Sequence, residues 1–164
     1  MDLGLSGKRA IVTGGTKGIG RRIVELLVAE GCHVGFCARD RKQVDDAVAE
    51  LATTGVTVIG GAVDVTDGDR LKAWIEEAAA GLGGIDILIP NASALVATAK
   101  AEDWRLGLEV DVLGTVRAVE AAMPFLEASD AAAIVAISST AAVNTSGGVR
   151  AYSGLKAALL SYIS

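Results

Sequence analysis

The feature that most constrains this chain is a regular alternation of short apolar runs with stretches of helical periodicity. The runs are nearly continuous in Val, Ile, Leu and Ala, as is typical of strands that are covered on both faces of a sheet. The stretches between them repeat apolar residues every three to four positions, as amphipathic helices do. Strands are expected at residues 9–13, 33–38, 56–63, 85–90 and 132–138. Helices are expected at residues 19–30, 40–53, 67–80 and 101–127, and from Tyr152 to the C-terminus.

Strand and helix follow one another without interruption, so each pair of strands is joined by a crossover helix and the strands run parallel. This predicts a doubly wound α/β fold of Rossmann type, with three layers and five strands. Residues 1–164 are expected to form one domain, because no linker or low-complexity stretch divides them. In such a sheet the ligand binds at the carboxyl ends of the strands.

Composition excludes several classes of protein. Hydrophobic residues make up 51% of the chain, which is too many for a disordered protein. The net charge of −5 does not suit a nucleic-acid binder. No apolar run reaches the roughly 18 residues of a membrane span, and the first residues do not form a signal peptide, so a cytoplasmic location is expected. His33 is the only histidine, and no His/Cys cluster has metal-ligand spacing, so no metal site is predicted.

A glycine-rich turn joins the first expected strand to the first helix. Gly14, Gly18 and Gly20 are spaced as G-x-x-x-G-x-G. Glycine permits positive φ and a close approach of the backbone to a ligand, and the amino end of the following helix attracts phosphate. Lys17 precedes the second glycine, and no Gly-Lys-Ser/Thr follows, so the turn is not the ATP-binding kind. The turn therefore predicts a dinucleotide site.

A second motif, Tyr152-x-x-x-Lys156, falls on the last expected helix, where residues four apart share a face. The lysine ammonium can stabilise a phenolate beside it, which prepares the tyrosine to exchange a proton with a carbonyl or alcohol. Upstream, an apolar strand ends in Ser138 and Ser139. A serine hydroxyl can stabilise charge that develops on a substrate oxygen.

Together these motifs resemble the short-chain dehydrogenase/reductase family, whose glycine turn reads T-G-x-x-x-G-x-G and whose catalytic serine precedes the tyrosine by 13 residues. The resemblance implies catalytic roles for Ser139, Tyr152 and Lys156. Asp111 occupies the position of the family's fourth catalytic residue, normally Asn. The family's Asn-Asn-Ala-Gly stretch corresponds to residues 90–93 here, with Asn91 and Ala92 matching and Ser93 in place of glycine.

The resemblance also implies a choice of cofactor. Ala38 stands where NAD-dependent members carry an acid, and the cations Arg39 and Lys17 would favour the 2′-phosphate of NADP. In the alternative alignment, Asp40 is the ribose-binding acid and the cofactor is NAD. The cofactor-binding residues that we expect share these motifs, with a further Asp-Val pair at the adenine. They are Gly14, Thr16, Lys17, Gly18, Ile19, Gly20, Arg39, Asp64, Val65, Asn91, Ala92, Ser93, Tyr152 and Lys156.

Residues 5–164 carry the resemblance, whereas family members continue well beyond this length, so the domain is expected to be incomplete at its C-terminus. The expected function is hydride transfer between NADP(H) and a small carbonyl or secondary alcohol, with 3-oxoacyl thioesters as one substrate class. The alternative is a truncated or inactive nucleotide-binding or interaction module of the same fold. Self-association as a dimer or tetramer is expected through the helix at 101–127 and the helix that carries Tyr152.

Overall fold

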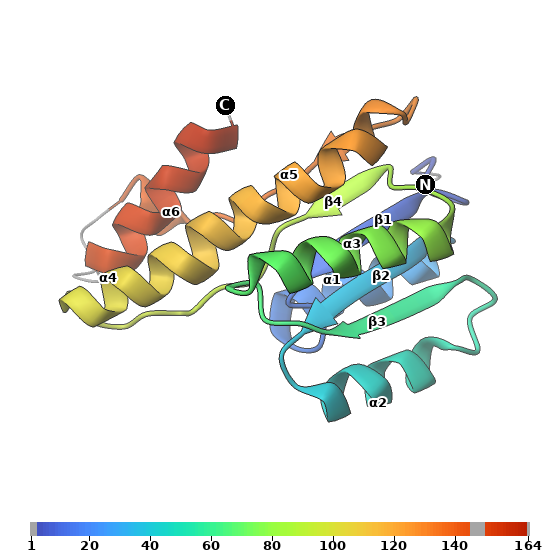
Figure 1. Ribbon diagram of the computed structural model, residues 1–164, viewed down its shortest axis with the longest axis horizontal. Helices are drawn as coiled ribbons and strands as arrows, with labels where there is room; N and C mark the ends of the chain where they lie inside the picture. Colours follow the sequence, from blue (N-terminus) through green and yellow to red (C-terminus); the bar gives the residue numbers. More distant parts are fainter. Residues whose placement is uncertain (1–2, 145–149, 164) are drawn as a thin grey trace.

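The computed structural model describes residues 3–144 and 150–163, which form an open five-stranded sheet flanked by helices (Figure 1). The strand order is β3-β2-β1-β4-β5, and each pair of neighbours is parallel. The order reverses between β1 and β4, where a doubly wound sheet opens a crevice for a ligand. The predicted fold class is confirmed. The strands are β1 (Arg9–Thr13), β2 (His33–Ala38), β3 (Val58–Ala62), β4 (Ile87–Ile89) and β5 (Ala133–Ile134).

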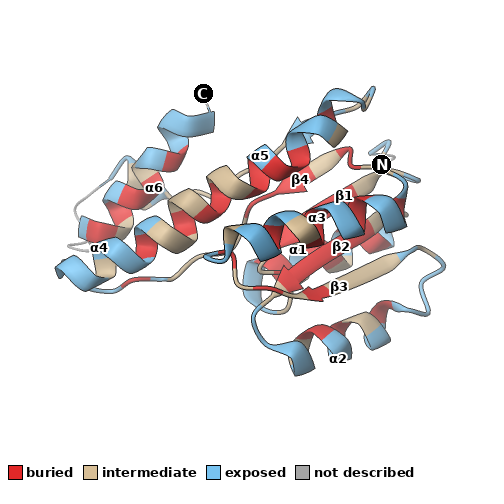
Figure 2. Ribbon diagram, in the orientation of Figure 1, coloured by how far each residue is buried: buried red, intermediate tan, exposed pale blue. Residues whose placement is uncertain are grey.

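The two faces of the sheet are covered by different helices. Neighbouring residues of a strand point to opposite faces: in β1, Ile11 packs with α3 and α5, whereas Val12 packs with α1 and α2. This gives the three predicted layers, and β1 and β2, at the centre of the sheet, are almost wholly buried, whereas β3 is drawn mostly as intermediate in Figure 2. The helices are α1 (Gly18–Ala29), α2 (Arg41–Leu51), α3 (Gly68–Leu82), α4 (Ala101–Gly107), α5 (Gly114–Glu127) and α6 (Arg150–Ile163).

The single helix predicted over residues 101–127 is wrong, because the structure divides it into three parts. α4 leads into a π-helix, η1 (Leu108–Leu113), which leads into α5. A π-helix accommodates an extra residue per turn and often marks a functional site. Asp111 lies within η1 and is buried.

The strand predicted over residues 132–138 is shorter than expected, since β5 contains only Ala133 and Ile134. Pairing with β4 nevertheless continues, because the amides of Val135 and Ile137 donate to the carbonyls of Leu88 and Pro90. Beyond this edge a 3-10 turn, η2 (Thr140–Ala142), leads toward α6. α6 packs against η2, α4 and η1, at the end of the molecule seen beside α4 in Figure 1.

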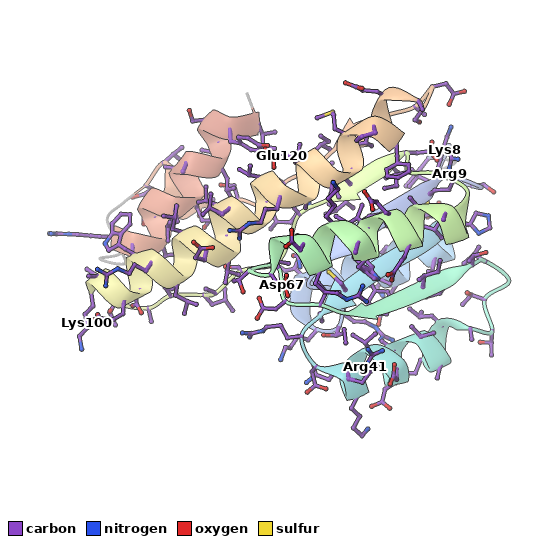
Figure 3. The ribbon with its side chains drawn as sticks, in the orientation of Figure 1. Lys8, Arg9, Arg41, Asp67, Lys100 and Glu120 are labelled. Atoms are coloured by element: carbon purple, nitrogen blue, oxygen red, sulfur yellow. The ribbon has the colours of Figure 1, made fainter. Side chains whose placement is uncertain are left out.

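The amino ends of β1 and β4 are fixed by a cluster of charged residues at the start of β1 and just before β4. The Arg9 guanidinium donates to both carboxylate oxygens of Asp86, at 2.8 and 2.6 Å, and Ser129 donates to the same carboxylate at 2.6 Å. The hydrogen bond from Arg9 holds the pKa of Asp86 well below its usual range, against the opposing effect of burial. Figure 3 shows Arg9 at the amino end of the sheet, far from Asp67 at the start of α3.

Within residues 3–144 and 150–163, no helix is both long enough and apolar enough to cross a bilayer.

Candidate active site

The glycine turn between β1 and α1 is held closely against the neighbouring strands. The amides of Gly14 and Gly15 both donate to the carbonyl of Cys37, at 2.8 and 3.1 Å. Gly14 and Gly18 have φ of +71° and +57°, a region that favours glycine. A Cβ on Gly20 would lie 2.1 Å from the carbonyl oxygen of Gly14, so only glycine lets α1 begin this close to β1.

The amino end of α1 differs from the starts of α2 and α3. Asp40 and Asp67 cap α2 and α3 by accepting backbone N–H bonds, whereas Lys17 gives α1 no side-chain cap. The first N–H groups of a helix need an acceptor, and a phosphate is a suitable one. A Cβ on Gly18 would meet no atom within 4 Å, so the turn borders open space. These features fit the pyrophosphate of a dinucleotide.

Asn91 joins the glycine turn to the end of β4. Its side-chain amide donates to the carbonyls of Thr13 and Gly14, at 3.0 and 3.1 Å. The backbone amides of Asn91 and Ala92 both donate to the Thr13 hydroxyl at 3.1 Å. Thr13 is the threonine of the T-G motif, and its buried hydroxyl fixes this junction, a role that the motif alone does not indicate.

A buried ion pair lies between η1 and α6. The Lys156 ammonium is 3.2 Å from Oδ1 of Asp111, and the exposed fractions of the two side chains are 3% and 2%. Lys156 also donates to the carbonyl of Ile137 at 3.0 Å. Its nitrogen lies 5.7 Å from the centre of the Tyr152 ring, within reach of a cation–π contact. Tyr152 is half-buried, with Val96 and Leu155 among the residues around it.

The residue that follows the Asn-Ala pair links this ion pair to the glycine turn. Ser93 donates to Oδ1 of Asp111 at 2.6 Å, and the Ala94 amide donates to Oδ2 at 2.8 Å. A continuous series of contacts therefore runs from the turn at Gly14 through Asn91 and Ser93 to Asp111 and Lys156. Thr115 donates to the Asp111 carbonyl at 2.7 Å, a contact that sequence reasoning missed.

The two serines after β5 have different partners. Ser138 donates its hydroxyl to the carbonyl of Lys156 at 2.9 Å, which ties the strand end to α6. Ser139 begins η2 and accepts a hydrogen bond from the Ala141 amide at 3.1 Å, so its own proton can be donated elsewhere. Of the two candidates, Ser139 is thus the better donor to a bound oxygen.

The residues expected around the adenosine part of the cofactor follow β2 and β3 or lie on the glycine turn. Arg39 and Lys17 are exposed, as is Ile19. Asp40, the alternative ribose ligand, caps α2 by accepting from the amide of Gln43 at 3.0 Å. Asp64 accepts from the amide and hydroxyl of Thr66, which forms a turn of the Asx type.

Two other residues expected at the cofactor, Val65 and Thr16, have partners within the protein. Val65 is buried and packs close to Gly114, so it belongs to the core beside α5. Thr16 donates to the side chain of Gln43 at 3.3 Å.

Burial raises the pKa of the Cys37 thiol to about 12, so this thiol stays protonated at neutral pH and is a poor nucleophile.

Comparison with known proteins agrees with this geometry. Residues 8–164 match the protein family described as short chain dehydrogenase. This chain belongs to the short-chain dehydrogenase family. It is 37% identical over 142 residues to isoepoxydon dehydrogenase of Penicillium expansum. The matched stretch covers 85% of this chain and 55% of that protein. It is 33% identical over 161 residues to human dehydrogenase/reductase SDR family member 4, in a match that covers 95% of this chain and 58% of that protein.

Solved structures of short-chain dehydrogenases share the fold. A short chain dehydrogenase from Burkholderia cenocepacia in complex with NADP superposes with a TM-score of 0.90 at 30% identity, over 96% of this chain and 66% of that one. A relative from Burkholderia phymatum in complex with NAD has a TM-score of 0.88 at 28% identity. The superposition covers 96% of this chain and 58% of that one. This chain spans a little over half the length of the curated relatives above.

Proposed function

We propose that this chain transfers hydride between NADP(H) and a small-molecule ketone or secondary alcohol, with Ser139, Tyr152 and Lys156 as the catalytic residues. One observation carries the proposal. The Lys156 ammonium is buried beside the Tyr152 ring, in a network that extends through Asn91 to the glycine turn. A buried lysine beside a tyrosine, in one network with a glycine turn that fits a dinucleotide, has the arrangement that proton transfer next to a nicotinamide requires.

Each residue has a role in carbonyl reduction. A nicotinamide, when bound, would supply the hydride that the carbonyl carbon of the substrate takes up. The Tyr152 hydroxyl gives its proton to the carbonyl oxygen, which completes the alcohol, and the positive charge of Lys156 stabilises the phenolate that is left. The Ser139 hydroxyl donates a hydrogen bond to the same oxygen as negative charge develops on it.

Preference for NADP is supported by charges at the end of β2. Ala38 ends the strand without a carboxylate, and the exposed cation Arg39 follows it. Lys17 adds a second exposed cation on the glycine turn. Asp40 is engaged as the cap of α2, which makes it a weaker candidate for the ribose hydroxyls. Two cations would favour the 2′-phosphate by charge-assisted hydrogen bonds.

Replacing Tyr152 with phenylalanine tests the proposal, since the change removes only the proton donor. The wild-type chain should bind NADPH more tightly than NADH and oxidise it with at least one member of a panel of ketones and 3-oxoacyl thioesters. Tyr152→Phe should lower kcat by about 100-fold or more and keep the NADPH Kd within a few-fold. The matched control is Tyr162→Phe, which alters an exposed tyrosine on the same helix and should leave both values unchanged.

The alternative function is a nucleotide-binding or interaction module without turnover. The observation that favours it is the ion pair between Asp111 and Lys156, because a carboxylate beside the ammonium weakens the effect of that ammonium on the Tyr152 phenol. NADPH binding by a folded wild-type chain, with no oxidation by any compound of the panel, would support the module. Full turnover by Tyr152→Phe would remove the tyrosine from the mechanism.

A further inference from the structure

The Asp111 carboxylate is fully engaged with donors from two other segments. Its Oδ1 accepts from the Ser93 hydroxyl at 2.6 Å and lies 3.2 Å from the Lys156 ammonium, and its Oδ2 accepts from the Ala94 amide at 2.8 Å. Ser93 and Asp111 are two of the three positions, with Pro90, where this chain departs from the family's motifs described above. They are 18 residues apart in the sequence, and in the structure they are in direct contact.

The orientation of the Ser93 hydroxyl is determined by a second hydrogen bond. The Leu95 amide donates to Ser93 Oγ at 3.2 Å, so the hydroxyl proton is directed at Asp111. Leu95 has φ of +51°, the one residue other than glycine in the described chain with positive φ. The backbone after β4 therefore takes a sparsely populated conformation in the segment whose amides and hydroxyl hold the carboxylate.

The carboxylate in turn determines where the ammonium lies. A lysine ammonium has three N–H donors. One of them is donated to the carbonyl of Ile137 at 3.0 Å, and a second can face Oδ1 of Asp111, which lies 3.2 Å from the nitrogen. The third remains for the cofactor or for the phenol of Tyr152. A buried ammonium without a compensating charge is unfavourable, and Asp111 supplies that opposite charge in this enclosed position.

We propose that Ser93 and Asp111 are positioning residues that act as one unit. Ser93 holds the Asp111 carboxylate, and the carboxylate holds Lys156 at the working distance from Tyr152. The inference rests on the proposed function, because it gives the unit its role in proton transfer. It requires the effects of changing the two residues to be coupled rather than additive.

The test uses Ser93→Ala, with Ser129→Ala as the matched control. Ser129 also donates to a buried aspartate of an ion pair at 2.6 Å, but it lies at the amino end of the sheet on Asp86 and Arg9. In the cofactor-free protein, acetylation of Lys156 by acetic anhydride is measured by mass spectrometry relative to the exposed Lys42. Ser93→Ala should raise the relative rate several-fold, and Ser129→Ala should leave it unchanged.

The kinetic arm adds Asp111→Asn and the double variant. Ser93→Ala should lower kcat about tenfold, the size expected for a hydrogen bond to a charged group, with the NADPH Kd within a few-fold. In the Asp111→Asn background, Ser93→Ala should have little further effect, because the carboxylate that it holds is gone. Ser93→Thr, which keeps a hydroxyl, should retain most of the activity.

Two results would overturn the inference. One is equal acetylation of Lys156 in Ser93→Ala and the wild type, or an equal increase in Ser129→Ala, which would indicate general loosening. The other is purely additive effects of Ser93→Ala and Asp111→Asn on kcat. Absence of turnover in the wild type would instead count against the proposed function, and the labelling of the cofactor-free protein would still decide whether Ser93 holds Lys156.

Discussion

Two buried aspartates of this protein form the same arrangement at opposite ends of the sheet. Asp86 accepts from Arg9 and Ser129 at the amino ends of the strands, and Asp111 accepts from Ser93 and pairs with Lys156 beyond the carboxyl ends. In the first pair the cation is an arginine that donates to both carboxylate oxygens, a rigid geometry that suits a role in holding the fold together. In the second pair the cation is a lysine with a donor to spare, which suits a site that exchanges protons.

The Asp86 pair should make the stability of the protein depend on pH. Arg9 lowers the folded-state pKa of Asp86, so the carboxylate stabilises the fold above its unfolded pKa of about 3.9 and loses this effect as the pH falls toward the folded value. Asp86→Asn should reduce the free energy of unfolding at pH 7 by about 3 kcal/mol. The difference from the wild type should shrink between pH 4 and pH 2, as measured by urea unfolding.

A difference between Asp86→Asn and the wild type that stays constant from pH 7 to pH 2 would contradict this account. Asp46→Asn is the control, because Asp46 pairs with Lys42 on the exposed surface of α2 and should affect stability little at any pH.

At the scale of elements, the start of α1 depends on the absence of a side chain at one position. Gly20→Ala would place a Cβ within 2.4 Å of the Asn91 side-chain nitrogen and still closer to the Gly14 carbonyl. Because one of these contacts is with backbone, α1 must shift from β1, at a cost of roughly 1–3 kcal/mol. We expect a lower Tm and at least a tenfold weaker NADPH Kd. Arg22→Ala, on the exposed part of the same helix, should leave the Tm unchanged and the NADPH Kd within twofold of the wild type.

The sequence predicted those elements whose causes lie within a short stretch of the chain, and it did not predict contacts between distant segments. The strand at 9–13, the glycine turn and the alternation of layers follow from periodicity and from glycine's freedom, and each was predicted correctly. The π-helix at residues 108–113 was not, because an extra residue per turn leaves no mark in a helical pattern of apolar residues. The contact of Ser93 with Asp111 was missed as well, since it joins a loop and a helix that the sequence does not show to be neighbours.

At the scale of the whole molecule, the fold brings segments from three parts of the chain to one place. The glycine turn follows β1, the Asn91–Ser93 segment follows β4, and α6 packs against η1 and η2 at the same side. Parallel strands make this inevitable, because their carboxyl ends all open at one edge of the sheet. The roles of Ser139, Tyr152 and Lys156 stay predictions, as does the self-association expected from the sequence.

The most direct test of the central claim, that the glycine turn and the Tyr152–Lys156 pair form one site, is to follow deuterium from the cofactor to the product. The folded chain is supplied with NADPH that carries deuterium on both faces of C4, together with a ketone that the panel identifies, and the product is examined by mass spectrometry. The account predicts an alcohol with one deuterium on its carbinol carbon from the wild type, and almost none from Tyr152→Phe. Tight binding of NADPH by the wild type with no deuterated alcohol from any ketone would contradict it.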